Sequence, residues 1–260
     1  MYLTDVHAPD CINLDNIFNF IAAFQPQHII GGGDLFDMTP FNHWVKNKPK
    51  LAAELPSVKD YYAECEDVFM GPLRKAVPRG CEFTFIKGNH EVWADKEVIA
   101  NPILLGDIEV EHRIKGNIRW IPQFEGVWLG NLFFIHGEHA LGVHHAKAMV
   151  LRYHRNIRYG HIHQIQEHSL TTADGSQITG RSGGTLQRKL PTFMQKRPHD
   201  WQYAFGYGWV DSDTGNFTDV CVRVELDGTF IAEGRVSCYP TRGVLPACSH
   251  SWGVSPQPLS

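Results

Sequence analysis

Apolar residues at helical spacing predict two helices in the first part of the chain. One stripe, with Asn13 as a suitable N-cap, consists of Leu14, Ile17, Phe18, Ile21 and Phe24. A second stripe starts at Val58 and runs through Phe69, and Gly71-Pro72 is expected to break or kink it. Residues 38–57 have no clear period and contain three prolines, so we expect a long surface loop there.

Short apolar runs that end in glycine or polar turns predict strands. They lie near residues 1–4, 27–30, 81–86, 117–121, 127–137 and 156–159, and a helix is expected within 139–154. From there to Ser237 the pattern is mostly strands and turns, with a hairpin signal at Asp227-Gly228. Alternating strands and helices predict an α/β fold. We expect a single domain over residues 1–239 and an extended or disordered tail over 240–260.

Polar side chains follow five of these strand-like runs. The five clusters are "TDVH" with Asp5 and His7, "GGDLFD" with Asp34 and Asp37, "KGNHE" with Asn89, His90 and Glu91, "FIHG" with His136, and "YGHIH" with His161 and His163. Such groups are costly to desolvate at the end of a buried strand unless something there needs them. Ligands of α/β sheets bind where strands end at their carboxyl edge, so we expect the clusters to converge.

The donor atoms of these clusters are carboxylate and amide oxygens and imidazole nitrogens, without a thiolate. This set suits divalent manganese, iron, zinc, cobalt or nickel better than copper(I) or calcium. Seven candidate ligands drawn from these ten side chains are too many for one ion and suit two. Two ions about 3.5–4 Å apart can clamp a phosphoryl group and activate a hydroxide between them. We therefore expect two divalent ions, with manganese first among the candidates.

The order DxH, GDxxD, GNHE, H and GHxH resembles the calcineurin-like metallophosphoesterase superfamily. The resemblance covers roughly residues 1–185 and includes "GRSGGT", where the family often has a glycine-rich turn. It implies a two-sheet β sandwich flanked by helices, in four αββα layers. The run before Asp5 is shorter than the family's usual first strand, so we expect a looser site at that end.

The resemblance also implies roles for single residues. Asp5, His7 and His163 would hold one metal, Asn89, His136 and His161 the other, and Asp34 would bridge the two. His90 would contact the phosphate and protonate the leaving oxygen. Asp37 and Glu91 would help to orient the site.

Composition bears more on the cellular compartment and the binding partners than on the reaction. The 260 residues carry a formal net charge of -4, which leans away from a long nucleic-acid track. Six scattered cysteines without a CxxC pair favour reduced thiols in the cytoplasm. The chain has neither a leader pattern nor a run of 18 apolar residues, so no membrane partner is expected. Oligomeric state does not follow from the pattern. Histidine is abundant at 15 residues, in keeping with metal chemistry.

The substrate is expected to be a phosphoester, either a small molecule or a nucleic acid. Candidate contacts are His43 and Trp44 in "FNHWVKNK", His139, and Arg181. Local packing, a solvated helix face and surface charge are the alternative interpretations of these four. We expect phosphodiesters to be favoured, because no arginine cluster near the motifs suits a doubly charged terminal phosphate. A nuclease, a phosphomonoesterase and a non-catalytic scaffold are alternatives, although a scaffold needs no seven convergent polar residues.

Overall fold

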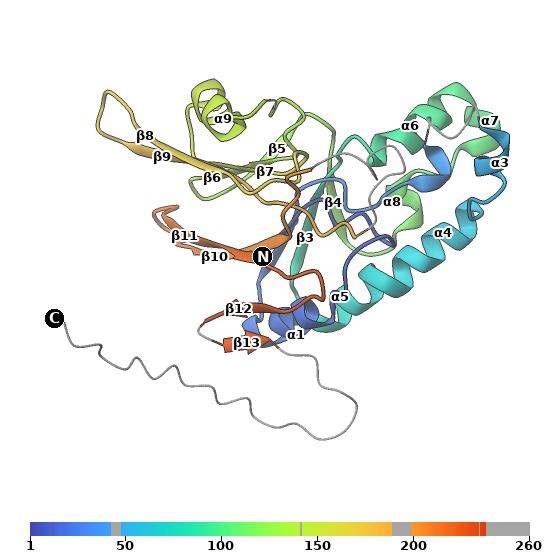
Figure 1. The fold of residues 1–260 in the computed structure, drawn as a ribbon, viewed down its shortest axis with the longest axis horizontal. Helices are drawn as coiled ribbons and strands as arrows, with labels where there is room; N and C mark the ends of the chain where they lie inside the picture. Colours follow the sequence, from blue (N-terminus) through green and yellow to red (C-terminus); the bar gives the residue numbers. More distant parts are fainter. Residues whose placement is uncertain (43–47, 141, 189–198, 234, 238–260) are drawn as a thin grey trace, which may run out of the picture.

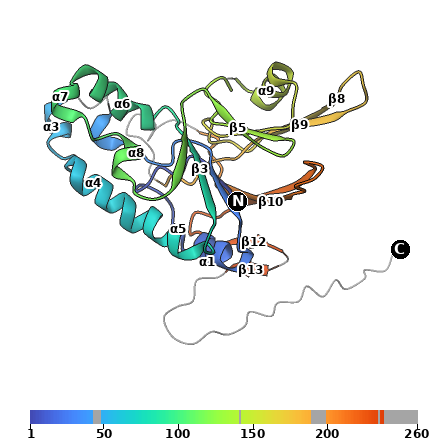
Figure 2. The ribbon, with the colours of Figure 1, turned by 180° about the vertical axis from the view of Figure 1, so that it is seen from behind.

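Two β-sheets face each other between outer helices (Figure 1). The computed structural model describes residues 1–42, 48–140, 142–188, 199–233 and 235–237. Figure 2, the view from behind, shows the same arrangement, with α9 outside one sheet and α1 on the far side of the other. The expected two-sheet sandwich flanked by helices is therefore confirmed.

Within the described residues, the first sheet has six strands in the order β11-β10-β1-β2-β3-β4. Its strands are β1 Tyr2–Leu3, β2 His28–Gly31, β3 Glu82–Ile86, β4 Ile118–Ile121, β10 Ala204–Val210 and β11 Phe217–Arg223. Strands β1 to β4 run parallel, with Tyr2 opposite Ile30 and Ile30 opposite Thr84. On its other side β1 pairs antiparallel with β10, with Tyr2 opposite Gly206. The short first strand is thus held from both sides.

The part of the chain that the structure describes contributes five strands to the second sheet, in the order β5-β6-β7-β9-β8. Its strands are β5 Gly126–Leu129, β6 Leu132–Ile135, β7 Ile157–Tyr159, β8 Glu167–Thr171 and β9 Gln177–Ser182. The central strands β6, β7 and β9 are parallel, with Phe133 opposite Ile157 and Ile157 opposite Gly180. A small separate hairpin consists of β12 Phe230–Ala232 and β13 Arg235–Ser237.

The helical elements cover the outer faces and one end of the sandwich. They are α1 Asp15–Phe24, the 3₁₀ turn η1 Thr39–Phe41, α3 Pro49–Ala52, α4 Val58–Cys65, the π-helical η2 Glu66–Met70, α5 Gly71–Ala76, α6 Glu91–Ala100, α7 Pro102–Leu105, α8 Val110–Arg113 and α9 His145–Tyr153. In Figure 1, α3, α4 and α6 to α8 gather at one end of the molecule.

Among the described residues, alternating side chains of the strands fill three separate cores. On β1, Leu3 packs toward α1 whereas Tyr2 packs between the sheets. On β6, Phe134 faces the space between the sheets, and Phe133 and Ile135 pack with Met149 of α9. This is the side-chain period of two expected for strands that are buried on both faces. Three cores between successive layers make the four-layer αββα arrangement.

Several helical boundaries differ from the expectation. Helix α1 begins at Asp15 with Leu14 as its N-cap, while the Asn13 side chain accepts a hydrogen bond from the Asp15 backbone N–H at 2.9 Å. The second helix also continues through Gly71-Pro72 instead of breaking. The π-helical turn changes the hydrogen-bond register before Pro72, which then lies in the first turn of α5, where a missing N–H costs no helical bond.

Two other segments contain helices that periodicity did not indicate. The expected loop over residues 38–57 includes η1 and α3, and the stretch after "GNHE" folds into α6, α7 and α8. Helix α6 has no single apolar face, because Ala94 is buried while Ile99 is 79% exposed. The Asp227-Gly228 hairpin is confirmed: the Gly228 N–H donates to Glu225 O at 2.8 Å.

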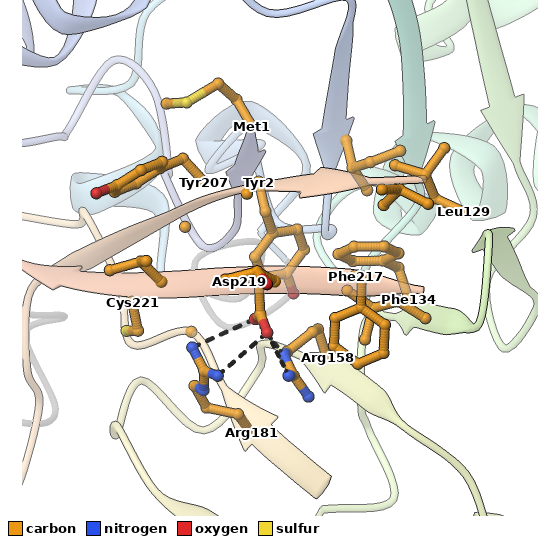
Figure 3. A pocket seen from close by; sticks show the side chains of 18 of the residues that line it. Met1, Tyr2, Leu129, Phe134, Arg158, Arg181, Tyr207, Phe217, Asp219 and Cys221 are labelled. Carbon is orange, nitrogen blue, oxygen red and sulfur yellow. Dashed lines mark hydrogen bonds and ion pairs between the residues drawn. The ribbon is translucent and has the colours of Figure 1, made fainter. Parts of the chain in front are cut away.

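The space between the sheets contains a cavity of about 60 Å³ (Figure 3). It is lined mainly by apolar side chains, with Arg158 and Arg181 at one side. Arg158 binds Asp219 through Nε and Nη2 at 2.6 and 2.7 Å, and Arg181 contacts the same carboxylate at 3.3 Å. Arg181 also donates to Glu167 at 2.6 Å. Both guanidinium groups are therefore engaged by carboxylates between the sheets.

The remaining expectations concern the tail, the thiols and the membrane. Residues 240–260 lie outside the described part of the chain. The described cysteines Cys11, Cys65, Cys81 and Cys221 carry free thiols. Within the described residues, no helix combines the length and the apolar character that crossing a bilayer requires.

Candidate metal centre

The five polar clusters lie at the carboxyl ends of strands from both sheets. In the first sheet, β1 leads to Asp5, β2 to Asp34 and β3 to Asn89; in the second, β6 leads to His136 and β7 to His161. Backbone hydrogen bonds join neighbouring loops within each sheet. The Asp5 N–H donates to Gly33 O at 3.0 Å, and the Gly160 N–H donates to His136 O at 2.7 Å. The parallel strands thus bring all five segments to one place.

The backbone at this place is strained. Five of the seven candidate ligands have φ between 48° and 70°, in the left-handed region: Asp5, His7, Asp34, His161 and His163. Such a conformation costs roughly 1–3 kcal/mol for a residue other than glycine, and it persists only where the surroundings enforce it. A concentration of such strain at candidate ligands is typical of functional sites.

Two motif glycines permit the loops to approach one another closely. A Cβ atom at Gly88 would overlap Asp34 Oδ1, and one at Gly160 would overlap Asp5 Oδ2 and Thr4 Oγ1. Each clash involves a buried polar group on a tightly held turn. The glycines of "GNHE" and "GHIH" therefore serve to bring carboxylates of neighbouring loops into the centre.

A first cluster consists of Asp5, His7 and His163. His163 Nε2 lies 3.1 Å from Asp5 Oδ1 and 3.2 Å from His7 Nε2, and all three side chains are buried. The end of the site near Asp5, expected to be loose, is firmly held. The Asp5 carboxylate accepts from Thr4 Oγ1 at 2.6 Å and from the His161 N–H at 3.0 Å.

A second cluster consists of Asp34, His136 and His161, with Asn89 beside it. His136 Nε2 lies 3.2 Å from Asp34 Oδ2 and 3.4 Å from Asn89 Oδ1. The His136 ring contacts the His161 ring, with centroids 5.2 Å apart. The structure therefore brings all seven candidate ligands together.

The hydrogen bond at Nδ1 of His136 shows whether its Nε2 can bind a cation. His136 Nδ1 donates to the Gly32 carbonyl oxygen at 2.8 Å, so the neutral ring presents a lone pair at Nε2. That lone pair faces the oxygens of Asp34 and Asn89, which are acceptors as well. Acceptors converging in a buried place repel each other unless a proton or a metal ion lies between them. The donor set therefore fits a divalent cation.

The directions of the pKa shifts at the site agree with this picture. Burial alone would lower the pKa of His136, but the Asp34 carboxylate raises this pKa well above its ordinary value. Burial would raise the pKa of Asp34, but His136 and His90 hold it well below the ordinary value. Burial also lowers the pKa of His7 and His161, which favours the neutral, metal-binding form of both rings.

His90 lies at the edge of the centre, where it forms a third group of possible ligands with His7 and Asp37. Its Nδ1 donates to the Asp37 carbonyl oxygen at 2.7 Å, and its Nε2 is 4.0 Å from Asp34 Oδ2. Burial would lower the pKa of His90, but the carboxylates of Asp34 and Asp37 raise it. A ring fixed at Nδ1, partly exposed and inclined toward the protonated form is suited to proton transfer at Nε2.

Asp37 and Glu91 hold the loops that carry the ligands. The Asp37 carboxylate accepts from His7 Nδ1 at 3.1 Å and from Thr39 Oγ1 at 2.5 Å, and these contacts help to hold its pKa at about 2 against burial. The fully buried Glu91 accepts from the backbone N–H groups of Asp34, Phe36 and Gly88 at 2.8–3.0 Å. Burial and the charge of Asp34 raise its pKa to about 7.

The four expected substrate contacts have different outcomes. His43 and Trp44 lie outside the described residues. His139 is exposed, and its ring stacks on the exposed Phe124 with centroids 5.6 Å apart. Arg181 is placed between the sheets on β9, where Glu167 and Asp219 engage its guanidinium. A role of Arg181 in substrate binding stays a prediction.

Some residues of the centre had no sequence signal. Thr4 is a strand residue whose hydroxyl binds the Asp5 carboxylate, and Gln187 donates to Asp37 Oδ1 at 3.3 Å. Trp201 packs against His163, and Trp93 packs against His90, with centroids 4.3 and 4.0 Å apart. The position of Thr4 just before "DVH" could have drawn notice, whereas the contact of Trp201 depends on the tertiary fold alone.

Comparisons with other proteins give a loose likeness of structure. No protein-family model and no curated protein matches the chain. A double mutant of Vps29 from Entamoeba histolytica shares 11% identity, with 91% of this chain and 94% of that one covered at a TM-score of 0.43. Vps29 from Chaetomium thermophilum shares 13% identity, with coverage of 86% and 89% and a TM-score of 0.45.

A third similar structure is a conserved uncharacterized protein from Streptococcus pneumoniae TIGR4, described as a predicted phosphoesterase. It shares 10% identity, with coverage of 92% and 91% and a TM-score of 0.32. At these scores the three structures carry no argument about activity. In this chain, the motifs whose order resembles that of the calcineurin-like metallophosphoesterases meet at the strand ends of a two-sheet sandwich.

Proposed function

We propose that this chain is a metal-dependent phosphoester hydrolase of the calcineurin-like type, with a preference for diesters. One observation carries the proposal: two groups of carboxylate and imidazole ligand atoms each lie within 4.8 Å of one another, with the Asn89 amide oxygen beside the second group. The full set of seven candidate ligands favours catalysis over a purely structural role, because burying so many polar groups is costly without a ligand.

The residues divide between two ions as the two clusters do. Asp5, His7 and His163 would hold one ion, and Asn89, His136 and His161 the other. Asp34 would reach both. Two divalent ions bound there would supply Lewis acidity toward a phosphoryl oxygen and a more acidic water near neutral pH. Manganese is our first candidate for the metal, and the free thiols of the described cysteines fit a cytoplasmic setting.

His90 would supply the proton for the leaving oxygen. Its Nδ1 is committed to the Asp37 carbonyl oxygen, so the proton available for transfer is the one at Nε2. Asp37 and Glu91 would not touch the substrate. Asp37 keeps the His7 ring in place through Nδ1, and Glu91 holds together the loops that carry Asp34 and Gly88.

The charges around the centre support the preference for a diester. Among the described residues, no lysine or arginine forms an ion pair with a candidate ligand. Lys87, which directly follows β3, is bound by Asp95 and Glu111 at 2.8 Å each. The second negative charge of a monoester would thus lack the cationic fork that recognises such groups.

The test is a substrate panel on metal-reconstituted protein. The panel contains p-nitrophenyl phosphate, bis-p-nitrophenyl phosphate, cyclic nucleotides, and single- and double-stranded DNA and RNA. The wild-type protein and the control His112→Gln, whose side chain is 56% exposed on α8, should hydrolyse the diesters, while His136→Gln should not. A higher rate on the monoester would reverse the preference, and cleavage of polymers alone would indicate a nuclease. Inactivity of the wild type on the whole panel would refute the proposal.

A further inference from the structure

Five aromatic rings form a continuous row along one side of the metal centre. The row runs Trp93, His90, His7, His163 and Trp201, with successive centroids 4.0, 4.6, 5.0 and 4.3 Å apart. The rings come from α6, from three different loops at strand ends, and from the segment just before β10. The three inner rings are histidines of the centre, and the two outer rings are tryptophans.

Both tryptophans are partly exposed, but they differ in their support. Trp93 packs its inner side against the core on the helical side of the first sheet. Trp201 belongs to none of the three cores in the described part of the chain, and its indole contacts the rings of His163 and His199. Tryptophan stabilises a fold mainly through burial of its ring. A ring that stays partly in water beside a polar centre therefore contributes little to the free energy of folding. Binding of a planar ligand explains such a position.

Among the described residues, no lysine or arginine forms an ion pair with a candidate ligand. The reacting phosphate would therefore bind mainly through the metal ions. Affinity for a diester must then come from the groups on its ester oxygens. An indole at the rim offers a flat apolar face, which is the surface on which nucleobases and aryl rings stack. Stacking tolerates different rings, so this recognition would define a class of substrate and not one compound.

We propose that Trp201, at the end of this row opposite Trp93, stacks on the non-reacting ester group of the substrate. The substrate is accordingly a phosphodiester with a planar ring, a nucleoside or an aryl group, on that side. This inference rests on the proposed hydrolase function and names its substrate class. Trp201 would act on substrate binding, so it should affect KM and leave kcat nearly unchanged.

The experiment compares two diesters with the same leaving group. Thymidine 5′-(p-nitrophenyl) phosphate and ethyl p-nitrophenyl phosphate both release p-nitrophenolate, and they differ in the group that stays on phosphorus. Trp201→Leu should raise KM for the thymidine ester by about 5- to 150-fold, the range expected for a lost base–aromatic stack. KM for the ethyl ester should change by less than about twofold. Trp201→Phe should recover part of the loss, because it restores an aromatic face.

Trp209→Leu is the matched control, since Trp209 is 53% exposed on β10 and packs against Phe24 and Tyr207. It should leave both substrates unaffected. Binding is measured independently by titrating thymidine monophosphate against intrinsic fluorescence, with quenching expected in the wild type and lost in Trp201→Leu. Equal losses on both substrates together with lost metal would show that Trp201 only supports His163, and would overturn the inference. An unchanged thymidine KM would overturn it as well, while hydrolysis of the ethyl ester would leave the proposed function intact.

Discussion

Glu91 holds two loops of the metal centre together, and its removal should cost stability as well as metal. In Glu91→Ala, the N–H groups of Asp34, Phe36 and Gly88 each lose their acceptor in a buried place. One unsatisfied buried N–H costs about 1–3 kcal/mol, so three would cost at least about 3 kcal/mol. Removal of a carboxylate whose pKa is already raised to about 7 by burial and by Asp34 offsets part of this cost.

We therefore expect Glu91→Ala to lose about 3 kcal/mol of unfolding free energy. Urea unfolding of the metal-free protein at pH 7 measures this loss as a lower midpoint with an unchanged slope. Glu91→Gln keeps one acceptor oxygen and should lose about half as much. Glu64→Ala, at an exposed position of α4, is the control and should stay within about 0.5 kcal/mol of the wild type. If Glu91→Ala unfolds at the midpoint of Glu64→Ala, Glu91 does not hold the loops.

Three further predictions concern metal and proton. Gly88→Ala should fold but lose metal, because its Cβ would overlap Asp34 Oδ1. Metal analysis and circular dichroism check this prediction, and full metal content in the variant would contradict it. His90→Ala should keep both metals and lose roughly 10²–10⁴-fold in rate on substrates with alkyl or nucleoside leaving groups. The loss should be smaller when p-nitrophenolate leaves. Equal losses on both kinds of substrate would exclude the acid role. Metal affinity should fall as pH falls, because Asp34 raises the pKa of His136 and the metal must displace that proton. Calorimetry in buffers of different ionisation enthalpy would detect the released proton, and a pH-independent affinity would argue against His136 as a ligand.

The location of the centre could be predicted from the sequence because strand direction determines it. Asp5, Asp34 and Asn89 each follow a parallel strand of one sheet, and His136 and His161 follow parallel strands of the other. Parallel neighbours end at the same edge, so polar residues just after them must meet. The glycines before Asn89 and His161 were visible as turn residues, but their steric role became clear only with the carboxylates that lie against them.

The parts that escaped prediction depend on long-range contacts or on local backbone register. Trp201 reaches His163 because the segment before β10 pairs with the His163 backbone: the Gln202 N–H donates to His163 O at 2.8 Å. No periodic pattern in the sequence predicts this contact. Helix α6 lacks an apolar stripe, so hydrophobic spacing could not identify it. The π-helical turn before Pro72 replaces the break that proline usually causes. Each case is a tertiary or hydrogen-bonding arrangement that overrides a local preference.

The central claim is that this chain hydrolyses phosphodiesters with two metal ions. The most direct measurement is the rate of bis-p-nitrophenyl phosphate hydrolysis by metal-free protein as manganese is added stepwise. The rate should rise with added metal and reach its plateau at two equivalents per chain. A chain that binds two equivalents and stays inactive, or one that is equally active without metal, would contradict the account.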